Sequence, residues 1–238
     1  MSIKNILITR QPDQSVELIN LLSNNRFYPY LLPMIETIPT PFELKKDVYD
    51  YVVLTSPNGV KYFSNYIKKI KAQNYVAVGT KTAEMLHLQG ITNMEIPDVF
   101  SQEGLVDYFS KKQLQGLHIL IPSPEKSSPN LKNFLISKGA MVEKPAIYKT
   151  ERLKYESGEL YHFLRGYAID TVIFASPSAV ESFFDNLGDE VSRLELTYIS
   201  IGQTTFNFLK NNFGIISYYP EEFTVNGVVE LINNMRRN

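Results

Sequence analysis

Small hydroxyl residues follow short apolar runs at matching places in this 238-residue chain. Ser56-Pro57 comes soon after the apolar residues 52–54, and Ser176-Pro177 soon after residues 172–174. Serine is a favourable helix N-cap and proline suits the first helical position, so each pattern predicts a buried strand, a sharp turn and a helix. Such a turn presents backbone N–H groups at the positive end of the helix dipole. This geometry favours binding of carboxylates or phosphates.

The usual catalytic signatures are absent from the sequence, including glycine-rich phosphate loops, zinc-protease helices and nucleophile elbows. There is no cysteine, which excludes disulfides and thiolate chemistry. The histidines His87, His118 and His162 do not have ligand spacing, so we expect no metal site. A phosphoacceptor receiver domain is disfavoured because Asp50 and Asp170 precede their strands instead of following them.

Composition and charge indicate a globular protein without a nucleic-acid partner. Hydrophobic residues make up 44% of the chain, and the formal net charge is −1 with dispersed lysine and arginine. That distribution leaves no basic patch for nucleic acid. No apolar run approaches the roughly 18 residues that a membrane span requires. We therefore expect a cytoplasmic protein that does not associate with membranes.

The same succession of motifs occurs twice along the chain. Ser56 and Ser176 are 120 residues apart, and the Gly-x-x-Thr motifs at Gly79 and Gly202 are 123 residues apart. A third pair, residues 100–106 and 223–229, shares the pattern Phe-Ser/Thr-x-x-Gly with the same spacing of 123. Earlier segments recur at spacings of 112 to 113 residues, such as 6–8 with 119–121. These nearly constant spacings indicate an internal duplication.

Strands that alternate with helices predict α/β structure, with two similar domains that each contain a doubly wound parallel sheet. Two domain boundaries are compatible with the sequence. A simple cut near residue 114 separates the two halves. Alternatively, the extended segments 34–41 and 146–152 carry the chain between domains, so that the central block forms one domain and the two ends form the other.

Ligands of open parallel sheets bind outside the carboxyl ends of the strands. The residues expected there are small hydroxyls and glycines: Thr9, Ser56, Gly79, Thr80, Ser123, Ser176 and Gly202. Each of them alone can be explained as a helix cap. Together they favour a ligand with several carboxylates or phosphates, held between the two domains.

The motifs taken together resemble the uroporphyrinogen-III synthase family. The resemblance covers almost the whole chain and rests on residues 9–12, 55–60, 78–83, 147–150, 174–180 and 201–205. It implies two α/β domains joined by a two-stranded connection, with residues 1–36 plus 150–238 in one domain and 37–149 in the other. The chain departs from the family at Ser123-Pro124, where an Arg-Gly pair is common, and at Gln203 and Phe206, where Pro and Ala are common.

The resemblance also implies a reaction. Enzymes of this family are cofactor-free hydro-lyases that cyclise hydroxymethylbilane to uroporphyrinogen III, with loss of water and inversion of the last pyrrole ring through a spiro intermediate. This small-molecule substrate is a linear tetrapyrrole with eight carboxylates, which suits the predicted anion-binding turns. Nothing in the sequence demands a dimer, so we expect a monomer.

Tyr148 matches a tyrosine of the family and is the expected hydrogen-bond donor to the departing hydroxyl, although it could instead pack a linker. The residues expected to bind substrate are Thr9, Arg10, Ser56, Asn58, Gly79, Thr80, Thr82, Ser123, Ser176, Ser178, Gly202, Thr204 and Thr205. Two rival interpretations are a non-catalytic two-lobed protein that binds an anionic metabolite and a nucleotide-sugar glycosyltransferase. The second is disfavoured because no acidic metal-binding pair ends a strand.

Overall fold

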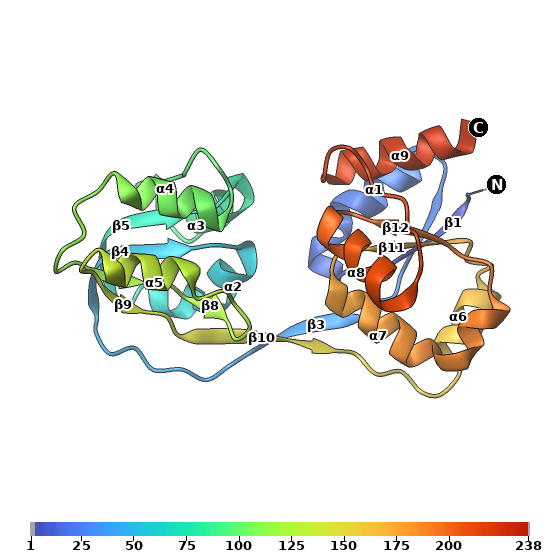
Figure 1. Ribbon diagram of the computed structural model, residues 1–238, viewed down its shortest axis with the longest axis horizontal. Coiled ribbons are helices and arrows are strands. Elements are labelled where there is room, and N and C mark those ends of the chain that lie inside the picture. Colours follow the sequence, from blue (N-terminus) through green and yellow to red (C-terminus); the bar gives the residue numbers. More distant parts are fainter. Residues whose placement is uncertain (1–2, 238) are drawn as a thin grey trace. The chain divides into compact units, whose positions relative to one another are not determined.

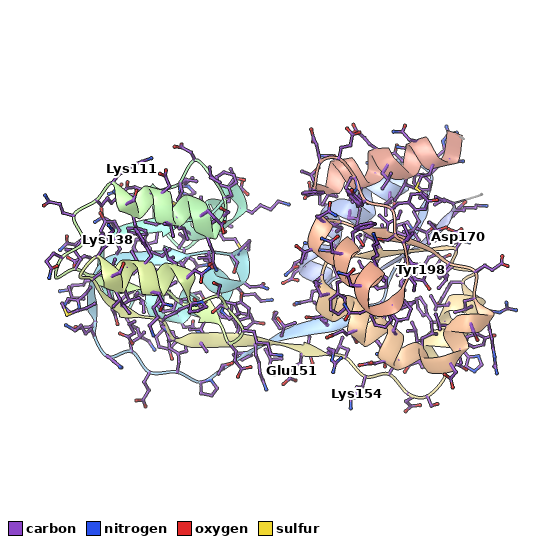
Figure 2. All side chains as sticks on the ribbon, viewed as in Figure 1. Lys111, Lys138, Glu151, Lys154, Asp170 and Tyr198 are labelled. Atoms are coloured by element: carbon purple, nitrogen blue, oxygen red, sulfur yellow. The ribbon has the colours of Figure 1, made fainter. Side chains whose placement is uncertain are left out.

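The computed structural model describes residues 3–237, which divide into two compact α/β units (Figure 1). Unit 1 comprises Met1–Glu36 and Glu151–Asn238, and unit 2 comprises Thr37–Thr150. The chain passes between the units along β3 (Ile35–Pro39) and β10 (Ala146–Arg152), which are neighbours in a small sheet with β8 (Ser123–Pro124). Glu151 and Lys154 lie on the segment that returns to unit 1 (Figure 2).

The described part of unit 1 contains a parallel sheet with strand order β12-β11-β1-β2. The strands are β1 (Asn5–Ile8), β2 (Tyr28–Leu31), β11 (Thr171–Phe174) and β12 (Thr197–Ser200). One face packs against α1 (Val16–Asn24) and α9 (Val225–Arg237). The other face packs against α6 (Glu159–Gly166), α7 (Pro177–Leu187) and α8 (Gln203–Phe213). Two short 3-10 helices span Pro12–Gln14 and Gly188–Arg193.

Unit 2 has a parallel sheet with strand order β6-β5-β4-β7-β9. The strands are β4 (Val48–Leu54), β5 (Lys71–Ala77), β6 (Met94–Glu95), β7 (His118–Leu120) and β9 (Met141–Glu143). One face packs against α2 (Pro57–Ile67) and α3 (Thr80–Leu88), and the other packs against α4 (Gln102–Ser110) and α5 (Asn130–Ser137). The prediction of doubly wound parallel sheets is confirmed.

The central strands supply apolar side chains to both faces of each sheet. Val52 and Leu54 belong to the core beneath α2 and α3, whereas Val53 belongs to the core beneath α4 and α5. In unit 1, Leu7 packs on the opposite face from Ile6 and Ile8. All of these side chains are fully buried. A continuous apolar run is therefore required, because alternate residues of a strand point to opposite faces.

Two aspartates hold the amino ends of neighbouring strands together. Asp170, labelled in Figure 2, precedes β11, and its Oδ2 accepts hydrogen bonds of 2.9 Å from the backbone N–H groups of Lys4 and Asn5 at the start of β1. Asp50 Oδ2 accepts a 2.8 Å bond from the N–H of His118 at the start of β7. Both carboxylates therefore satisfy backbone donors at the sheet edge opposite to the predicted ligand turns.

The Asp170→Ala variant is expected to lose about 2 kcal/mol of unfolding free energy, because two charge-assisted hydrogen bonds are lost together. Urea unfolding followed by circular dichroism measures this change. The matched control is Glu221→Ala, which removes an exposed carboxylate and should change stability by less than about 0.5 kcal/mol. Equal effects of the two substitutions would contradict a structural role for Asp170.

Candidate functional site

In unit 2, the turn between β4 and α2 brings Ser56 to the carboxyl end of the sheet. Ser56 Oγ accepts a 3.1 Å hydrogen bond from the N–H of Gly59, as expected of an N-cap. The same oxygen lies 3.2 Å from the hydroxyl of Tyr148 on β10. The helix cap and the tyrosine therefore form one hydrogen-bonded group, although 92 residues separate them in sequence.

The ring of Tyr148 is held by packing. It is only 6% exposed and stacks on the ring of Tyr62 from α2, with centroids 5.1 Å apart and planes 20° apart. The hydroxyl of Tyr62 donates to the carbonyl oxygen of Thr37 on β3 and lies 2.9 Å from Thr37 Oγ1. The tyrosine pair thus fixes the position of the Tyr148 phenol.

Burial raises the pKa of Tyr148, the hydrogen bond with Ser56 lowers it, and Tyr62 raises it, with a net upward shift. The phenol is therefore protonated at neutral pH and can donate a hydrogen bond. A phenol with a raised pKa does not readily surrender its proton. Tyr148 is consequently suited to stabilise developing negative charge on an oxygen by hydrogen bonding, without full proton transfer.

The next turn of unit 2 differs because its N-cap is a glycine. Gly79 has φ of +85°, a conformation that favours glycine, and it supplies no side chain to cap α3. Thr80, the first residue of the helix, is exposed. Thr82 is only 1% exposed, so its side chain offers little surface to a ligand. Anion binding at this turn therefore falls to backbone N–H groups and Thr80.

Unit 1 repeats both kinds of turn. Ser176 Oγ accepts a 3.3 Å hydrogen bond from the N–H of Ala179, and its φ of −156° closely matches the −160° of Ser56. Gly202 is the N-cap of α8 and again provides no capping side chain. Thr204 is exposed, whereas Thr205 is 3% exposed and packs into the unit. The glycine turns are thus the ones that leave the helix start available to an anion.

Arg10 brings a positive charge to the carboxyl end of β1. Its Nη2 is 3.5 Å from Gln14 Oε1, and its buried Nε has no hydrogen-bond acceptor among the described residues. Desolvation by burial lowers the pKa of the guanidinium, while Glu17 and Asp13 raise it. Arginine remains charged despite such shifts, since its pKa is so high. A ligand carboxylate would offset the desolvation of this cation.

The hydroxyl groups of Ser123 and Thr9 are buried and bonded to backbone carbonyls. Ser123 does not begin a helix, because it lies in β8 beside β10 and is buried. Its hydroxyl donates to the carbonyl of Ile121 at 3.0 Å, and the next helix starts only at Asn130. Thr9 is also fully buried, with its hydroxyl donating to the carbonyl of Ile173 at 2.8 Å. Both side chains stabilise the fold.

The other predicted residues lie in the first turns of helices. Asn58 and Ser178 are the second residues of α2 and α7, and both are half-buried. Sequence reasoning missed Tyr62, which positions Tyr148. Its spacing of four residues from Asn58 was the available signal, because residues i and i+4 lie on the same face of a helix.

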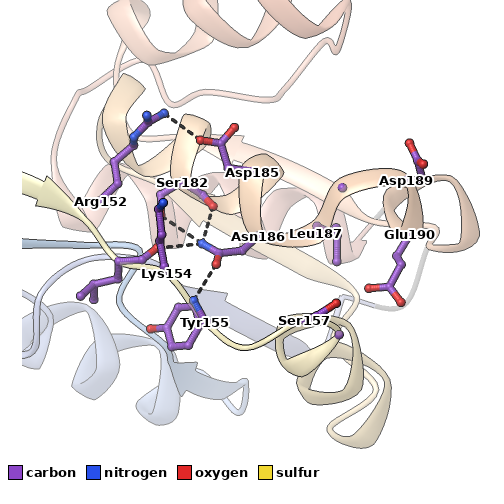
Figure 3. Close-up of a pocket in the computed structure, with 13 residues that line it drawn as sticks. Arg152, Lys154, Tyr155, Ser157, Ser182, Asp185, Asn186, Leu187, Asp189 and Glu190 are labelled. Atoms are coloured by element: carbon purple, nitrogen blue, oxygen red, sulfur yellow. Dashed lines mark hydrogen bonds and ion pairs between the residues drawn. The ribbon is translucent and has the colours of Figure 1, made fainter.

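A cavity of about 800 Å³ lies elsewhere in unit 1, between the later turns of α7 and the segment after β10. Figure 3 shows how side chains tie these parts together: Asn186 Nδ2 donates to the Leu153 carbonyl at 2.8 Å, and Asn186 Oδ1 accepts from the Tyr155 N–H at 2.7 Å. Arg152 and Asp185 pair at 2.8 Å. Helix α7 begins at the Ser176 turn, whereas the cavity lies at the other end of this helix. We therefore assign the cavity a structural role.

Within residues 3–237, no group of three or more histidine, aspartate or glutamate side chains could hold a metal ion. No helix in this range is both long and apolar enough to cross a membrane. The arrangement therefore offers hydrogen-bond donors and one half-buried cation as its chemical groups.

Comparison with known proteins places the chain among tetrapyrrole enzymes. A family model described as uroporphyrinogen-III synthase HemD matches residues 16–230. The uroporphyrinogen-III synthase of Synechococcus elongatus is 26% identical, with 98% of this chain and 96% of the relative covered. The crystal structures of the Helicobacter pylori and Thermus thermophilus enzymes share the fold, with TM-scores of 0.65 and 0.60 and 18% identity. These structures cover 98% and 99% of this chain, and all of each solved chain is matched.

Replacing either capping serine by alanine is expected to lower the unfolding free energy by about 1 kcal/mol, because an N–H at the helix start loses its acceptor. The variants are Ser56→Ala and Ser176→Ala, measured by urea unfolding. The matched controls are Ser56→Gly and Ser176→Gly, which should cost only a few tenths of a kcal/mol because glycine is also a favourable N-cap residue. Alanine variants as stable as the parent protein would contradict the capping role.

Proposed function

The chain belongs to the uroporphyrinogen-III synthase family, and we propose from this that it converts hydroxymethylbilane to uroporphyrinogen III. Family membership makes it an enzyme of tetrapyrrole biosynthesis that acts on a small molecule. Its further classification as a carbon–oxygen hydro-lyase is part of the proposal. The main structural support for a role of particular residues is the 3.2 Å contact between the hydroxyl groups of Tyr148 and Ser56 at the start of α2.

The first step is loss of the terminal hydroxyl of the substrate. The lone pair of the adjacent pyrrole nitrogen expels the C–O bond electrons onto oxygen, which leaves as water after gaining a proton. Tyr148 donates a hydrogen bond to that oxygen as its negative charge develops. The raised pKa of Tyr148 keeps the donor proton in place through this step. Solvent supplies the proton that completes the water.

The second step is attack by the last pyrrole ring on the resulting cationic carbon, which gives the spiro intermediate. The bond to that ring then breaks and re-forms in the inverted orientation, and loss of a ring proton to solvent gives the neutral product. Here the protein acts by positioning, because direct closure of the chain competes with inversion. We assign substrate carboxylates to the backbone N–H groups of the glycine turns and to the guanidinium of Arg10. Both interactions are available without a cofactor.

The proposed substrate-contact residues are those that keep exposed or half-buried surface at the turns. They are Arg10, Ser56, Asn58, Gly79, Thr80, Ser176, Ser178, Gly202 and Thr204. Thr9, Thr82, Ser123 and Thr205 have buried side chains, and their expected contacts with substrate stay predictions. A non-catalytic binding protein, the main alternative, is not favoured by the family match. The cytoplasmic location and monomeric state expected from the sequence stay predictions.

The purified protein is expected to form the type III isomer from freshly made hydroxymethylbilane. Unassisted closure of this substrate gives the symmetric type I isomer, so excess type III reports ring inversion. Oxidation of the products and chromatographic separation of the porphyrin isomers measure the ratio. A heat-denatured sample is the control. Type III at the level of that control would overturn the proposed function.

The Tyr148→Phe variant is expected to reduce kcat about 100-fold, because it removes the donor to the leaving oxygen and keeps the stacked ring. The matched control is Tyr75→Phe, which removes another buried phenol of unit 2 and should leave kcat within about twofold. Circular dichroism checks that both variants fold. Full activity of Tyr148→Phe would assign the donor role to another group.

The pH dependence provides a second readout for the same variant. Because burial raises the pKa of Tyr148, its protonated form persists through neutral and mildly alkaline pH. The ratio of parent to Tyr148→Phe rates should therefore stay constant from about pH 7 to pH 9. A ratio that falls toward one within this range would mean that the phenol ionises there.

A further inference from the structure

One repeated motif has no role in the mechanism above, namely Phe-Ser/Thr-x-x-Gly at residues 100–104 and 223–227. Phe100 and Phe223 occupy equivalent positions, and each is 56% exposed. Each lies just before a helix, α4 in unit 2 and α9 in unit 1. An exposed aromatic ring leaves apolar surface in water, so its appearance at the same place in both units calls for a physical explanation.

Both phenylalanines lie at the centre of a tight three-residue turn. The N–H of Ser101 donates to the carbonyl of Val99 at 2.9 Å, and the N–H of Thr224 donates to the carbonyl of Glu222 at 2.7 Å. This pattern is that of a γ-turn with the phenylalanine as its middle residue. The turn directs the side chain outward from the backbone while both flanking peptides are held.

The glycine of each motif locks the turn against the following helix. A Cβ at Gly104 would lie 2.0 Å from the carbonyl oxygen of Val99, and one at Gly227 would lie 2.2 Å from that of Glu222. Any other residue would displace the turn. The hydroxyl oxygens of Ser101 and Thr224 also accept the N–H groups of these glycines, at 3.1 Å and 3.0 Å. Each phenylalanine is therefore presented by a rigid and specifically built support.

Each ring also lies beside the glycine turn that we assign to substrate carboxylates. A Cβ at Gly79 would lie 3.8 Å from Phe100 Cδ2, and one at Gly202 would lie 4.0 Å from Phe223 Cγ. These are van der Waals distances, so a flat apolar surface adjoins an anion-binding turn in each unit. In unit 1 that surface continues to Tyr219, whose ring centroid is 6.4 Å from that of Phe223.

We propose that Phe100 and Phe223 each bind the face of one pyrrole ring of the linear tetrapyrrole, while the carboxylates of that ring reach the adjacent glycine turn. This inference rests on the proposed function and assigns the substrate two aromatic subsites. A pyrrole is a planar, electron-rich ring with acidic side chains at its edge. An aromatic platform next to the backbone N–H groups of a helix start is complementary to both parts, and aromatic pairs prefer centroid distances of about 4.5–7 Å. The rings thus set which face of a pyrrole the enzyme holds.

The test compares steady-state kinetics with hydroxymethylbilane for Phe100→Ala, Phe223→Ala and the parent protein. Each alanine variant is expected to raise KM about tenfold while thermal unfolding stays unchanged, because an exposed ring that binds substrate adds little to folding. Phe100→Tyr and Phe223→Tyr keep the ring face and should have a KM within about twofold of the parent value. Phe100→Leu and Phe223→Leu keep apolar bulk without an aromatic face, so their KM should be raised as in the alanine variants.

The matched control is Tyr28→Ala, which removes a ring that is 53% exposed at the amino end of β2, away from the turns. Its KM should equal that of the parent. An unchanged KM in both alanine variants, or an equal rise of KM in Tyr28→Ala, would overturn the proposed aromatic subsites. In that case, type III product from the parent protein would still support the proposed function. Absence of type III product from the parent would overturn both conclusions.

Discussion

The first N–H groups of every helix lack a partner within that helix, and this constraint organises both units of the protein. Parallel strands bring several helix starts to one edge of each sheet. Serine caps satisfy these groups at α2 and α7, where Ser56 and Ser176 accept the N–H groups of Gly59 and Ala179. At α3 and α8 the caps are glycines, which provide no side-chain acceptor. The duplicated fold therefore alternates closed and open helix starts, and the open ones are available to an anionic substrate.

The same constraint explains why the chain needs few catalytic side chains. Backbone N–H groups can bind carboxylates without additional lysine or arginine side chains. This agrees with the formal net charge of −1 of the chain. The one specialised group in unit 2 is Tyr148, whose phenol lies on a helix cap and whose ring is stacked on Tyr62. Burial raises its pKa, so the environment favours a hydrogen-bond donor and disfavours an ionised base. A reaction driven by the substrate's own nitrogen lone pair asks for little more.

The sequence predicted the parallel doubly wound sheets because continuous apolar strands and capped helix starts leave strong local patterns. Ser56 and Ser176 were identifiable for that reason. Ser123 follows β7 as expected, but it begins a short strand and not a helix. A hydroxyl followed by proline suits both, and only the pairing with β10 decides between them. The spacing of the Gly-x-x-Thr motifs did not show that the side chains of Thr82 and Thr205 are buried, and the contact of these residues with substrate stays a prediction. The contact between Tyr148 and Ser56 depends on tertiary structure and could not be derived from local spacing.

The two glycine turns also show that the copies have diverged in backbone as well as in sequence. Gly79 has φ of +85° and requires glycine, whereas Gly202 has φ of −147°, an extended conformation open to any residue. The absence of a side chain at Gly202 is therefore not explained by backbone strain. The nearest atom to a Cβ at that position would be Phe223 Cγ at 4.0 Å, an ordinary van der Waals distance, so packing within unit 1 does not require glycine there either. A glycine there keeps both the helix start and the neighbouring ring face open, so turn and ring are best understood as parts of one subsite.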